Sequence, residues 1–366
     1  MKDKILLSSS DFNEDFSSLK NITFFELELE NYLKSDKKTV ALNSGTSAIH
    51  LALILAGVVK NDIVFCQTAT FSASAFPILY QGAEPVFIDS EEDTWNMCPV
   101  VLEEAIRNML AIGKKPKAII IVHLYGMPAK MDAIVAIAKK NNIILIEDAA
   151  EALGSSFKKK KCGTFGEFGV LSFNENKIIT TSGGGALVCV SENEKQKAVF
   201  LATQARDIAP HYQHTSIGYN YRMSSVLADI GKKQIDILDT NVALRRKNNQ
   251  FYQKLFKNID GIMILIEPCT NYYSNHWLTC ILINDKITGF TREDLRLQLK
   301  VDNIESRPLW KPMHLQPVFK DCLYFGETVA ENLFENGLCL PSGSNLTDDD
   351  RKRIKQSIKK LLRTCS

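Results

Sequence analysis

Lys177 is the residue of this sequence whose surroundings best suit covalent chemistry. It lies in a short polar turn between two apolar, strand-like runs, residues 169–173 and 186–190, and the glycines at 183–185 let the backbone fold back closely. A buried, positioned lysine has a lowered pKa, which suits a nucleophilic amine or a Schiff base with an aldehyde cofactor. The alternative is a solvated lysine on a surface hairpin, which is the more frequent situation for a lysine taken alone.

A turn of small residues at 43–47, Asn-Ser-Gly-Thr-Ser, is a second candidate site. It joins a short strand, residues 39–42, to a helical run at 48–56. The free backbone N–H groups and the dipole at a helix N-terminus can bind an anion such as a phosphate. An ordinary capped helix would have the same sequence, because Ser and Thr are favoured at N-caps.

Three further residues follow predicted strands. Asp148 comes directly after an apolar run at 143–147, where a carboxylate can pair with a protonated pyridine nitrogen or simply cap a helix. Phe71 follows the strand at 63–66, and its ring can stack on a flat cofactor or fill the core. We interpret His123, at another strand end, as a structural histidine.

The elements between these residues predict a scaffold that brings strand ends together. Apolar strands alternate with amphipathic helices from residue 39 to residue 147, which predicts a mostly parallel sheet covered on both faces, with ligands at the carboxyl ends of its strands. A long polar loop at 207–219 and long helices at 223–256 follow. We expect a large α/β domain over residues 1–240 and a smaller α+β domain over residues 241–366.

Composition excludes several classes of function. A formal net charge of +2 gives no reason to expect a nucleic-acid partner. The nine cysteines are scattered without a C-x-x-C pair, so we expect reduced thiols and no metal site. There is no apolar run long enough to cross a membrane and no signal-like leader, which predicts a cytoplasmic protein with no membrane partner.

Considered together, these features resemble the DegT/DnrJ/EryC1/StrS sugar aminotransferase family. The resemblance is carried by six motifs, which lie at residues 42–48, 147–152, 163–169, 172–177, 183–185 and 218–224. It implies a pyridoxal phosphate-dependent transferase of fold type I, the architecture of aspartate aminotransferase. That architecture has a large domain with a mostly parallel central sheet and a smaller C-terminal α+β domain.

Within the family, the sequence is most similar to the aminotransferases of the UDP-N-acetylbacillosamine pathway. The similarity lies in residues 123–126, 129–132, 177–185, 307–314 and 340–343. It implies transfer of an amino group from L-glutamate to C4 of a UDP-4-keto-6-deoxy-N-acetylhexosamine. The product, UDP-4-amino-4,6-dideoxy-N-acetylglucosamine, would serve bacterial polysaccharide biosynthesis or protein glycosylation. Another 4-keto or 3-keto nucleotide sugar, for example one linked to dTDP, is the alternative substrate.

The resemblance also assigns roles to residues of this chain. Lys177 would carry the cofactor on its amine and move a proton, and Asp148 would hold the pyridinium nitrogen. Glu151 would lie near the cofactor's 3-hydroxyl, and Phe71 would stack on its ring. The phosphate would be bound by four small residues, namely Gly45, Thr46, Ser47 and Ser172.

Three residues would act across a homodimer interface. Asn220 would reach the phosphate in the neighbouring subunit, and Arg222 and His314 would face the diphosphate or the sugar of the substrate there. The resemblance therefore makes a homodimer with shared active sites a functional requirement.

Two departures from the family pattern favour other readings. Glu175 stands where relatives usually have glycine, and residues 8–23 form a shorter N-terminal segment than usual, without an Ile-Ala-Pro-Leu-Gly-like stretch. They support a catalytically silent paralogue that acts as a binding partner, against which the retained Lys177, Asp148 and Asn220 argue. A sugar dehydratase of the same fold would have histidine in place of Lys177, and a DNA-binding regulator would need a helix-turn-helix region.

Overall fold

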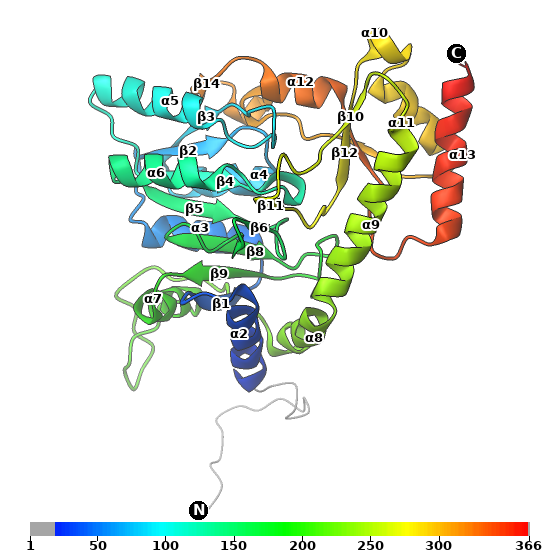
Figure 1. Cartoon of the computed structure of the whole chain (residues 1–366). Coiled ribbons are helices and arrows are strands. Elements are labelled where there is room, and N and C mark those ends of the chain that lie inside the picture. Colours follow the sequence, from blue (N-terminus) through cyan, green and yellow to red (C-terminus); the bar gives the residue numbers. More distant parts are fainter. Residues whose placement is uncertain (1–18, 365–366) are drawn as a thin grey trace, which may run out of the picture.

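The computed structural model describes residues 19–364, so residues 8–18 of the short N-terminal segment lie outside it. Within residues 19–364, eight strands form the central sheet (Figure 1). From edge to edge they are β1 (Lys38–Leu42), β9 (Gly185–Cys189), β8 (Phe168–Ser172), β5 (Ile144–Asp148), β4 (Ala118–Val122), β2 (Ile63–Gln67), β3 (Glu84–Ile88) and β14 (Tyr324–Phe325). Only β9 runs against the others, because it pairs antiparallel with both β8 and β1. The predicted α/β class with a mostly parallel sheet is confirmed.

Helices cover both faces of this sheet, which explains why its strands are continuously apolar. In β4, Ile120 packs toward one face and its neighbours Ile119 and Ile121 pack toward the other, and all three are fully buried. One face is covered by α3 (Gly45–Leu55), α4 (Ser72–Tyr80) and α7 (Glu192–Ala202). The other is covered by α2 (Leu19–Leu33), α5 (Pro99–Ala111), α6 (Met131–Asn141) and α8 (Ser225–Asp236).

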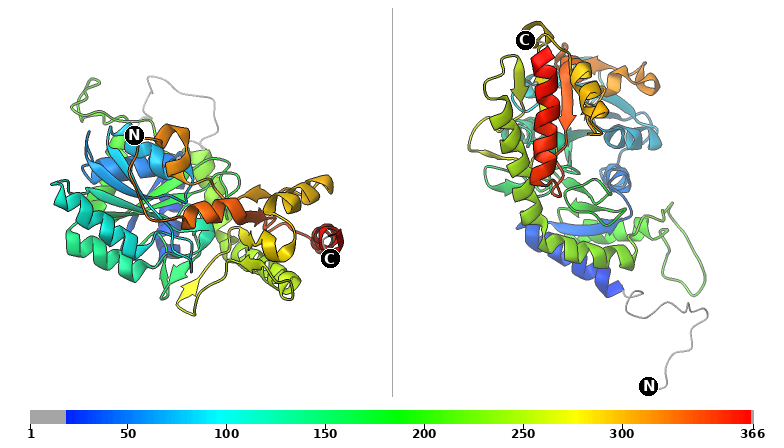
Figure 2. Two further views of the ribbon diagram at one scale, coloured as in Figure 1. Left: turned by 90° about the horizontal axis from the view of Figure 1, so that it is seen from above. Right: turned by 90° about the vertical axis from the view of Figure 1, so that its right-hand side faces the viewer.

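Residues beyond α8 build a second, smaller layer beside the central sheet. The long helix α9 (Leu238–Phe256) leads to an antiparallel sheet of β10 (Ile262–Ile264), β12 (Thr279–Ile283), β15 (Gly337–Leu340) and β13 (Arg307–Pro308). One face of this sheet packs on α9, α11 (Arg292–Val301) and α13 (Asp348–Thr364). Figures 1 and 2 show α13 at the far edge of the molecule from the central sheet.

The opposite face of the small sheet packs against the large layer. Cys280 of β12, together with Trp277 and Leu309 just outside the strands, forms one hydrophobic cluster with Tyr125, which comes from the loop after β4. In addition, β14 belongs to the C-terminal part of the sequence but pairs with β3 of the central sheet. The division of the chain at residue 240 therefore remains a proposal.

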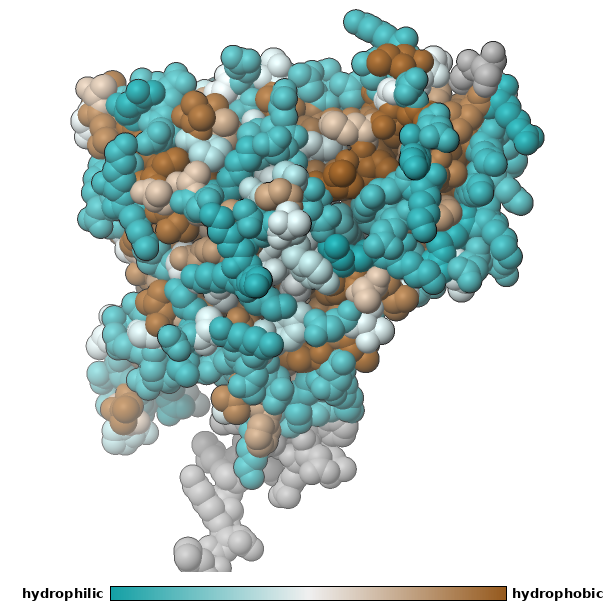
Figure 3. All heavy atoms as spheres, viewed as in Figure 1, coloured by the Kyte–Doolittle hydropathy of each residue, from teal (hydrophilic) through white to brown (hydrophobic). Residues whose placement is uncertain are grey.

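Figure 3 shows one face of the molecular surface, coloured by hydropathy. On the face that Figure 3 shows, hydrophilic residues cover most of the surface and hydrophobic residues are interspersed among them. No helix in residues 19–364 combines the length and the apolar character that crossing a membrane requires.

Candidate active site

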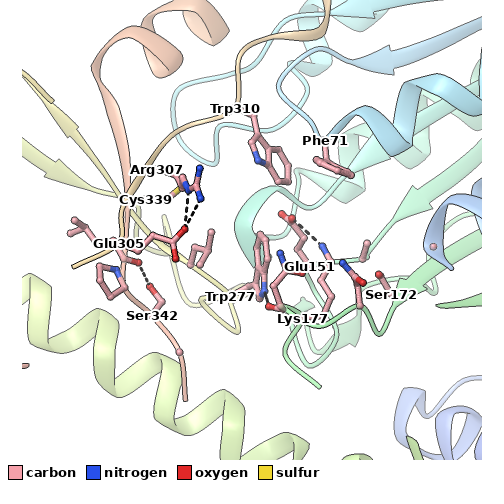
Figure 4. Close-up of a pocket in the computed structure, with 18 of the residues that line it drawn as sticks. Phe71, Glu151, Ser172, Lys177, Trp277, Glu305, Arg307, Trp310, Cys339 and Ser342 are labelled. Carbon is pink, nitrogen blue, oxygen red and sulfur yellow. Dashed lines mark hydrogen bonds and ion pairs between the residues drawn. The ribbon is translucent and has the colours of Figure 1, made fainter. Parts of the chain in front are cut away.

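A cavity of about 990 Å³ lies at the carboxyl ends of β1, β2, β5 and β8, between the central sheet and the small sheet. This is the edge at which a parallel sheet binds ligands. The cavity is lined by seven of the eleven residues predicted for the site, namely Gly45, Thr46, Phe71, Asp148, Glu151, Ser172 and Lys177. The small layer contributes a second set of lining residues, which includes Trp277, Glu305, Arg307, Trp310 and Ser342 (Figure 4).

Lys177 points into this cavity from the connection between β8 and β9. Those strands pair antiparallel, with Ser172 opposite Gly185, so the lysine lies between two strands and the connection is a hairpin. The side chain of Lys177 is 13% exposed, and its Nζ lies 3.3 Å from Oε1 of Glu151. The same Nζ lies 4.4 Å from the centre of the Trp277 ring, within the range of a cation–π interaction. The lysine is therefore held between a carboxylate and an aromatic face.

Glu151 is a buried carboxylate that titrates near neutral pH. Its side chain is only 3% exposed, and its Oε2 accepts a hydrogen bond of 2.9 Å from the backbone N–H of Tyr125. Burial raises the pKa of Glu151 to about 7, although the ammonium of Lys177 and the N–H of Tyr125 oppose the rise. Glu151 can therefore hold or release a proton beside the lysine at neutral pH.

Asp148 is the last residue of β5 and is 6% exposed. Its Oδ2 accepts a hydrogen bond of 2.6 Å from the hydroxyl of Ser74 in α4, and its Oδ1 accepts one of 3.1 Å from the N–H of Ala150. Ser74 in turn lies 2.7 Å from the hydroxyl of Thr70. These contacts fix the orientation of a carboxylate that lines the cavity.

The N-terminus of α3 forms a cradle beside these groups. Ser44 caps the helix, since its side chain accepts a hydrogen bond of 3.0 Å from the N–H of Ser47. A Cβ on Gly45 would lie 3.2 Å from the Cβ of Ser172, and a Cβ on Gly185 would lie 2.4 Å from the backbone N of Gly45. The glycines therefore let β9 and Ser172 approach the first turn of α3, whose N–H groups favour an anion.

Four predicted site residues do not line the cavity of their own chain. Ser47 is nearly buried and donates a hydrogen bond of 2.6 Å to Oδ1 of Asn43. Asn220 is exposed, and its carbonyl accepts a hydrogen bond of 3.1 Å from the side chain of Asn43. The roles proposed for Arg222 and His314 across the dimer interface stay predictions.

Arg222 and His314 each have polar partners within the chain. Arg222 pairs with Glu26 of α2 and donates a hydrogen bond of 2.9 Å to the carbonyl of Ala41. His314 lies 2.7 Å from the hydroxyl of Thr68 and 3.2 Å from Oε1 of Glu331. Both side chains therefore tie together elements around the cavity.

His123 and Glu175 are placed away from the chemistry. His123 is fully buried, and its Nε2 lies 3.0 Å from Oε2 of Glu147. Its Nδ1 accepts a hydrogen bond of 3.1 Å from the N–H of Ala129, so the ring proton is on Nε2 and faces Glu147. His123 is therefore a structural residue, and Glu175 is exposed in this chain.

Sequence reasoning missed Ser74, Trp277 and Trp310. The hydroxyl of Ser74 holds Asp148, whereas Trp277 and Trp310 form an aromatic wall with Phe71, whose ring centre lies 5.7 Å from that of Trp310. The signal for Trp310 was its place in the stretch 307–314, whereas Trp277 had only its rarity, since the sequence has three tryptophans. The described residues hold no group of three or more His, Cys, Asp or Glu side chains able to bind a metal ion.

Comparison with known proteins identifies the family. The model of the DegT/DnrJ/EryC1/StrS aminotransferase family matches residues 7–359. The chain belongs to this family. The family assignment predicted from the motifs is confirmed, and the protein is a pyridoxal phosphate-dependent sugar aminotransferase.

Named relatives and a solved structure align with most of this chain. EpsN of Bacillus subtilis (strain 168), named provisionally as a pyridoxal phosphate-dependent aminotransferase, is 48% identical over 90% of this chain and 84% of its own length. GDP-perosamine synthase of Escherichia coli O157:H7 is 37% identical over 87% of this chain and 84% of its own length. The crystal structure of a family member from Brucella abortus superposes with a TM-score of 0.86, at 29% identity, over 93% of this chain and 90% of that one.

The residues of the cavity fit the family's cofactor. Pyridoxal phosphate has an aldehyde, a pyridine nitrogen and a phosphate, and the cavity presents the amine of Lys177, the carboxylate of Asp148 and the N-terminus of α3. The close approach of Ser172 to Gly45 adds a hydroxyl beside the helix N-terminus. The aldehyde, the pyridine nitrogen and the phosphate thus each have a chemically matched group in the chain.

Proposed function

We propose that the protein transfers an amino group from L-glutamate to C4 of a UDP-linked 4-keto-6-deoxy-N-acetylhexosamine. The product would be UDP-4-amino-4,6-dideoxy-N-acetylglucosamine, a precursor for bacterial glycans. The single observation that carries a transamination site is the convergence of Lys177, Glu151 and Asp148 on one cavity at the carboxyl edge of the sheet. The finer choice of sugar rests on the sequence motifs described above.

Each residue of the site has a distinct task in this proposal. When bound, pyridoxal phosphate supplies an electron sink for the carbon that loses or gains the amine. Lys177 holds the cofactor by its amine and moves a proton at the reacting carbon. Asp148, oriented by Ser74, keeps the pyridine nitrogen protonated, because an opposite charge favours the charged form. Glu151 exchanges a proton with its surroundings near neutral pH, as its raised pKa allows.

The outer half of the cavity is the proposed place of the nucleotide sugar. Its wall combines the aromatic Trp310 with the polar groups of Arg307 and Ser342, all from the small layer. Aromatic faces and hydrogen-bonding side chains are the usual surroundings of a bound small molecule. We further propose a homodimer in which Asn220 reaches the partner's phosphate site, because it does not line the cavity of its own chain.

A second candidate substrate is a keto sugar linked to another nucleotide. It is favoured by the similarity to the E. coli protein named GDP-perosamine synthase, at 37% identity. The chemistry at Lys177 would be the same for both candidates. The difference would lie in the nucleotide and in the stereochemistry of the sugar.

The test is the visible absorption spectrum of the protein with pyridoxal phosphate, recorded before and after L-glutamate is added. Conversion of the cofactor band to the pyridoxamine form establishes the first half of the reaction. The pyridoxamine form is then mixed with UDP-, GDP- and dTDP-linked 4-keto sugars and with a UDP-linked 3-keto sugar. Return of the original band with only the UDP-linked 4-keto sugar supports the proposal, and return with another sugar replaces it. A band that glutamate leaves unchanged favours another donor or a silent paralogue.

A further inference from the structure

Trp277 makes two independent contacts with the segment that carries Lys177. Its indole Nε1–H donates a hydrogen bond of 2.8 Å to the carbonyl of Asn176, the residue before the lysine. Its ring centre lies 4.4 Å from Nζ of Lys177. The two residues are 100 positions apart in the sequence, and Trp277 belongs to the loop that enters β12 of the small sheet. Figure 4 shows the ring beside Lys177 and Glu151.

After the lysine, the turn is anchored by Asn241, whose side chain donates a hydrogen bond of 3.0 Å to the carbonyl of Ile178, whereas the residues before the lysine are exposed. Residues 174–176 are exposed, and the N–H of Lys177 bonds back 3.0 Å to the carbonyl of Asn174 within the same turn. The bond from Trp277 therefore connects an exposed turn to a buried side chain of the small layer. A fixed turn matters here because a displacement of about 1 Å at a reacting group can lower a rate about a hundredfold.

Trp277 is itself rigidly held. It is 4% exposed, and its N–H donates a hydrogen bond of 2.9 Å to Oδ1 of Asn275. Its carbonyl accepts a hydrogen bond from Arg245 of α9. The amide of Asn275 also donates a bond of 2.8 Å to the carbonyl of Glu151, so one loop contacts both residues of the Lys177–Glu151 pair.

We infer that Trp277 is a positioning residue for Lys177, which fixes the lysine turn through its N–H and stabilises the ammonium form of the amine with its ring. The inference rests on the catalytic role proposed for Lys177. The charged groups that face the amine are Glu151 at 3.3 Å and, in the same cavity, Asp148. Both favour the ammonium form and are unchanged by a substitution at Trp277, so the contribution of the ring can be measured on its own.

Two substitutions separate the two contacts. Trp277→Phe keeps an aromatic ring but removes the N–H donor, and Trp277→Leu removes both while keeping the site apolar. Trp310→Leu is the control, because Trp310 lines the same cavity and packs on Tyr125 and on the edge of Trp277, but it makes no hydrogen bond or cation–π contact with Lys177 within the described structure. Trp310→Leu is compared only for the labelling of the Lys177 amine and for the amide hydrogen exchange of the lysine turn.

The amine is followed in the cofactor-free protein, by the pH dependence with which an amine reagent labels the peptide containing Lys177. We expect Trp277→Leu to speed the labelling of Lys177 at neutral pH by about threefold to thirtyfold relative to wild type, since the ring no longer stabilises the cation. Amide hydrogen exchange of residues 174–178 should become faster in both Trp277 variants. Trp310→Leu should change neither quantity.

Turnover of the keto sugar is the third readout. The kcat of both Trp277 variants should fall about tenfold or more, with little change in KM. A Trp277→Leu protein whose Lys177 is labelled at the same rate as in Trp310→Leu, or a Trp277→Phe protein with wild-type exchange in the turn, would overturn the inference. If Trp277→Leu does not fold, Trp277→Phe decides through exchange alone. A wild-type protein that aminates none of the keto sugars would overturn the proposed function, while labelling and exchange would still decide the role of Trp277.

Discussion

Ser74 donates a hydrogen bond of 2.6 Å to Oδ2 of Asp148 and thereby ties the first turn of α4 to the last residue of β5. Ser74 is fully buried, so no water can replace its hydroxyl without rearrangement. The pair makes the orientation of Asp148 a property of the scaffold.

We predict that Ser74→Ala weakens the binding of pyridoxal phosphate about tenfold or more, because a buried hydrogen bond to a charged group is lost. An absorbance titration of the cofactor-free protein measures this change. Ser90→Ala is the control, since Ser90 is 2% exposed and its hydroxyl has no hydrogen-bond partner within the described structure. Equal cofactor affinity in the two variants would show that Ser74 does not support Asp148.

Lys177→Ala should abolish turnover and leave a folded protein. The reaction needs an amine that holds the cofactor and moves a proton, and no other lysine lines the cavity in the part of the chain that the structure describes. Steady-state assays and circular dichroism check the two halves of the prediction. Lys161→Ala serves as a control, because Lys161 is half-buried but lies outside the cavity. Measurable turnover by Lys177→Ala would remove the central role of this residue.

The titration of Glu151 predicts how stability depends on pH. Its pKa is raised by burial from 4.5 to about 7, so between those values the folded protein binds a proton that the unfolded chain has released. The contribution of Glu151 to the free energy of unfolding is complete below pH 4.5 and falls by about 3 kcal/mol as the pH rises to 7.

Glu151→Gln should remove this contribution, because the amide does not titrate. Denaturant unfolding of the cofactor-free proteins at pH 5 and pH 7.5 measures the difference. Glu175→Gln should keep the wild-type dependence, since Glu175 is exposed. A wild-type curve that rises across this window relative to Glu151→Gln would contradict the assignment.

The extent to which sequence predicts this site depends on how far apart the interacting residues lie. The turn with Lys177, the capped start of α3 and the position of Asp148 at a strand end follow from patterns within about fifteen residues. Each could be recognised because a strand, a turn residue and a helix start are local features. The edge of the sheet where they meet followed from the prediction that most strands run parallel.

Long-range partners left no local pattern. Ser74 and Asp148 are 74 positions apart, and Trp277 and Asn176 are 101 positions apart. The strand β14 has two residues and pairs with β3, so it is too short to show a period of two. The raised pKa of Glu151 depends on burial, which only the assembled fold determines.

Gly185 is predicted to be intolerant of a side chain. A Cβ there would lie 2.4 Å from the backbone of both Ser44 and Gly45, and backbone atoms cannot move aside without shifting α3. Gly185→Ala should lower the free energy of unfolding by about 2 kcal/mol or more and weaken cofactor binding. Gly183→Ala is the matched control, because a Cβ at Gly183 meets nothing within 4 Å, and its unfolding free energy should change by less than about 0.5 kcal/mol. Equal stabilities would contradict the close approach.

The proposed action of Asn220 across a homodimer interface can be tested by mixing inactive subunits. Asn220→Ala and Lys177→Ala each damage every site of their own homodimers. If Asn220 serves the partner's site, a mixed dimer has one site with both substitutions and one site with neither. Equal mixing makes half of the dimers mixed, so about a quarter of the wild-type activity should return.

The alternative geometry gives the opposite result. If Asn220 acted within its own chain, both sites of a mixed dimer would carry one substitution, and no activity would return. The control mixture combines Lys177→Ala with Asp148→Ala, two residues that line the cavity of the same chain, and should stay inactive. Subunits are exchanged in mild denaturant and then assayed, with the mixed dimer confirmed by native mass spectrometry. Recovery in the Asn220 mixture alone would establish a shared site, because no arrangement within one chain can rebuild an intact site from these two subunits.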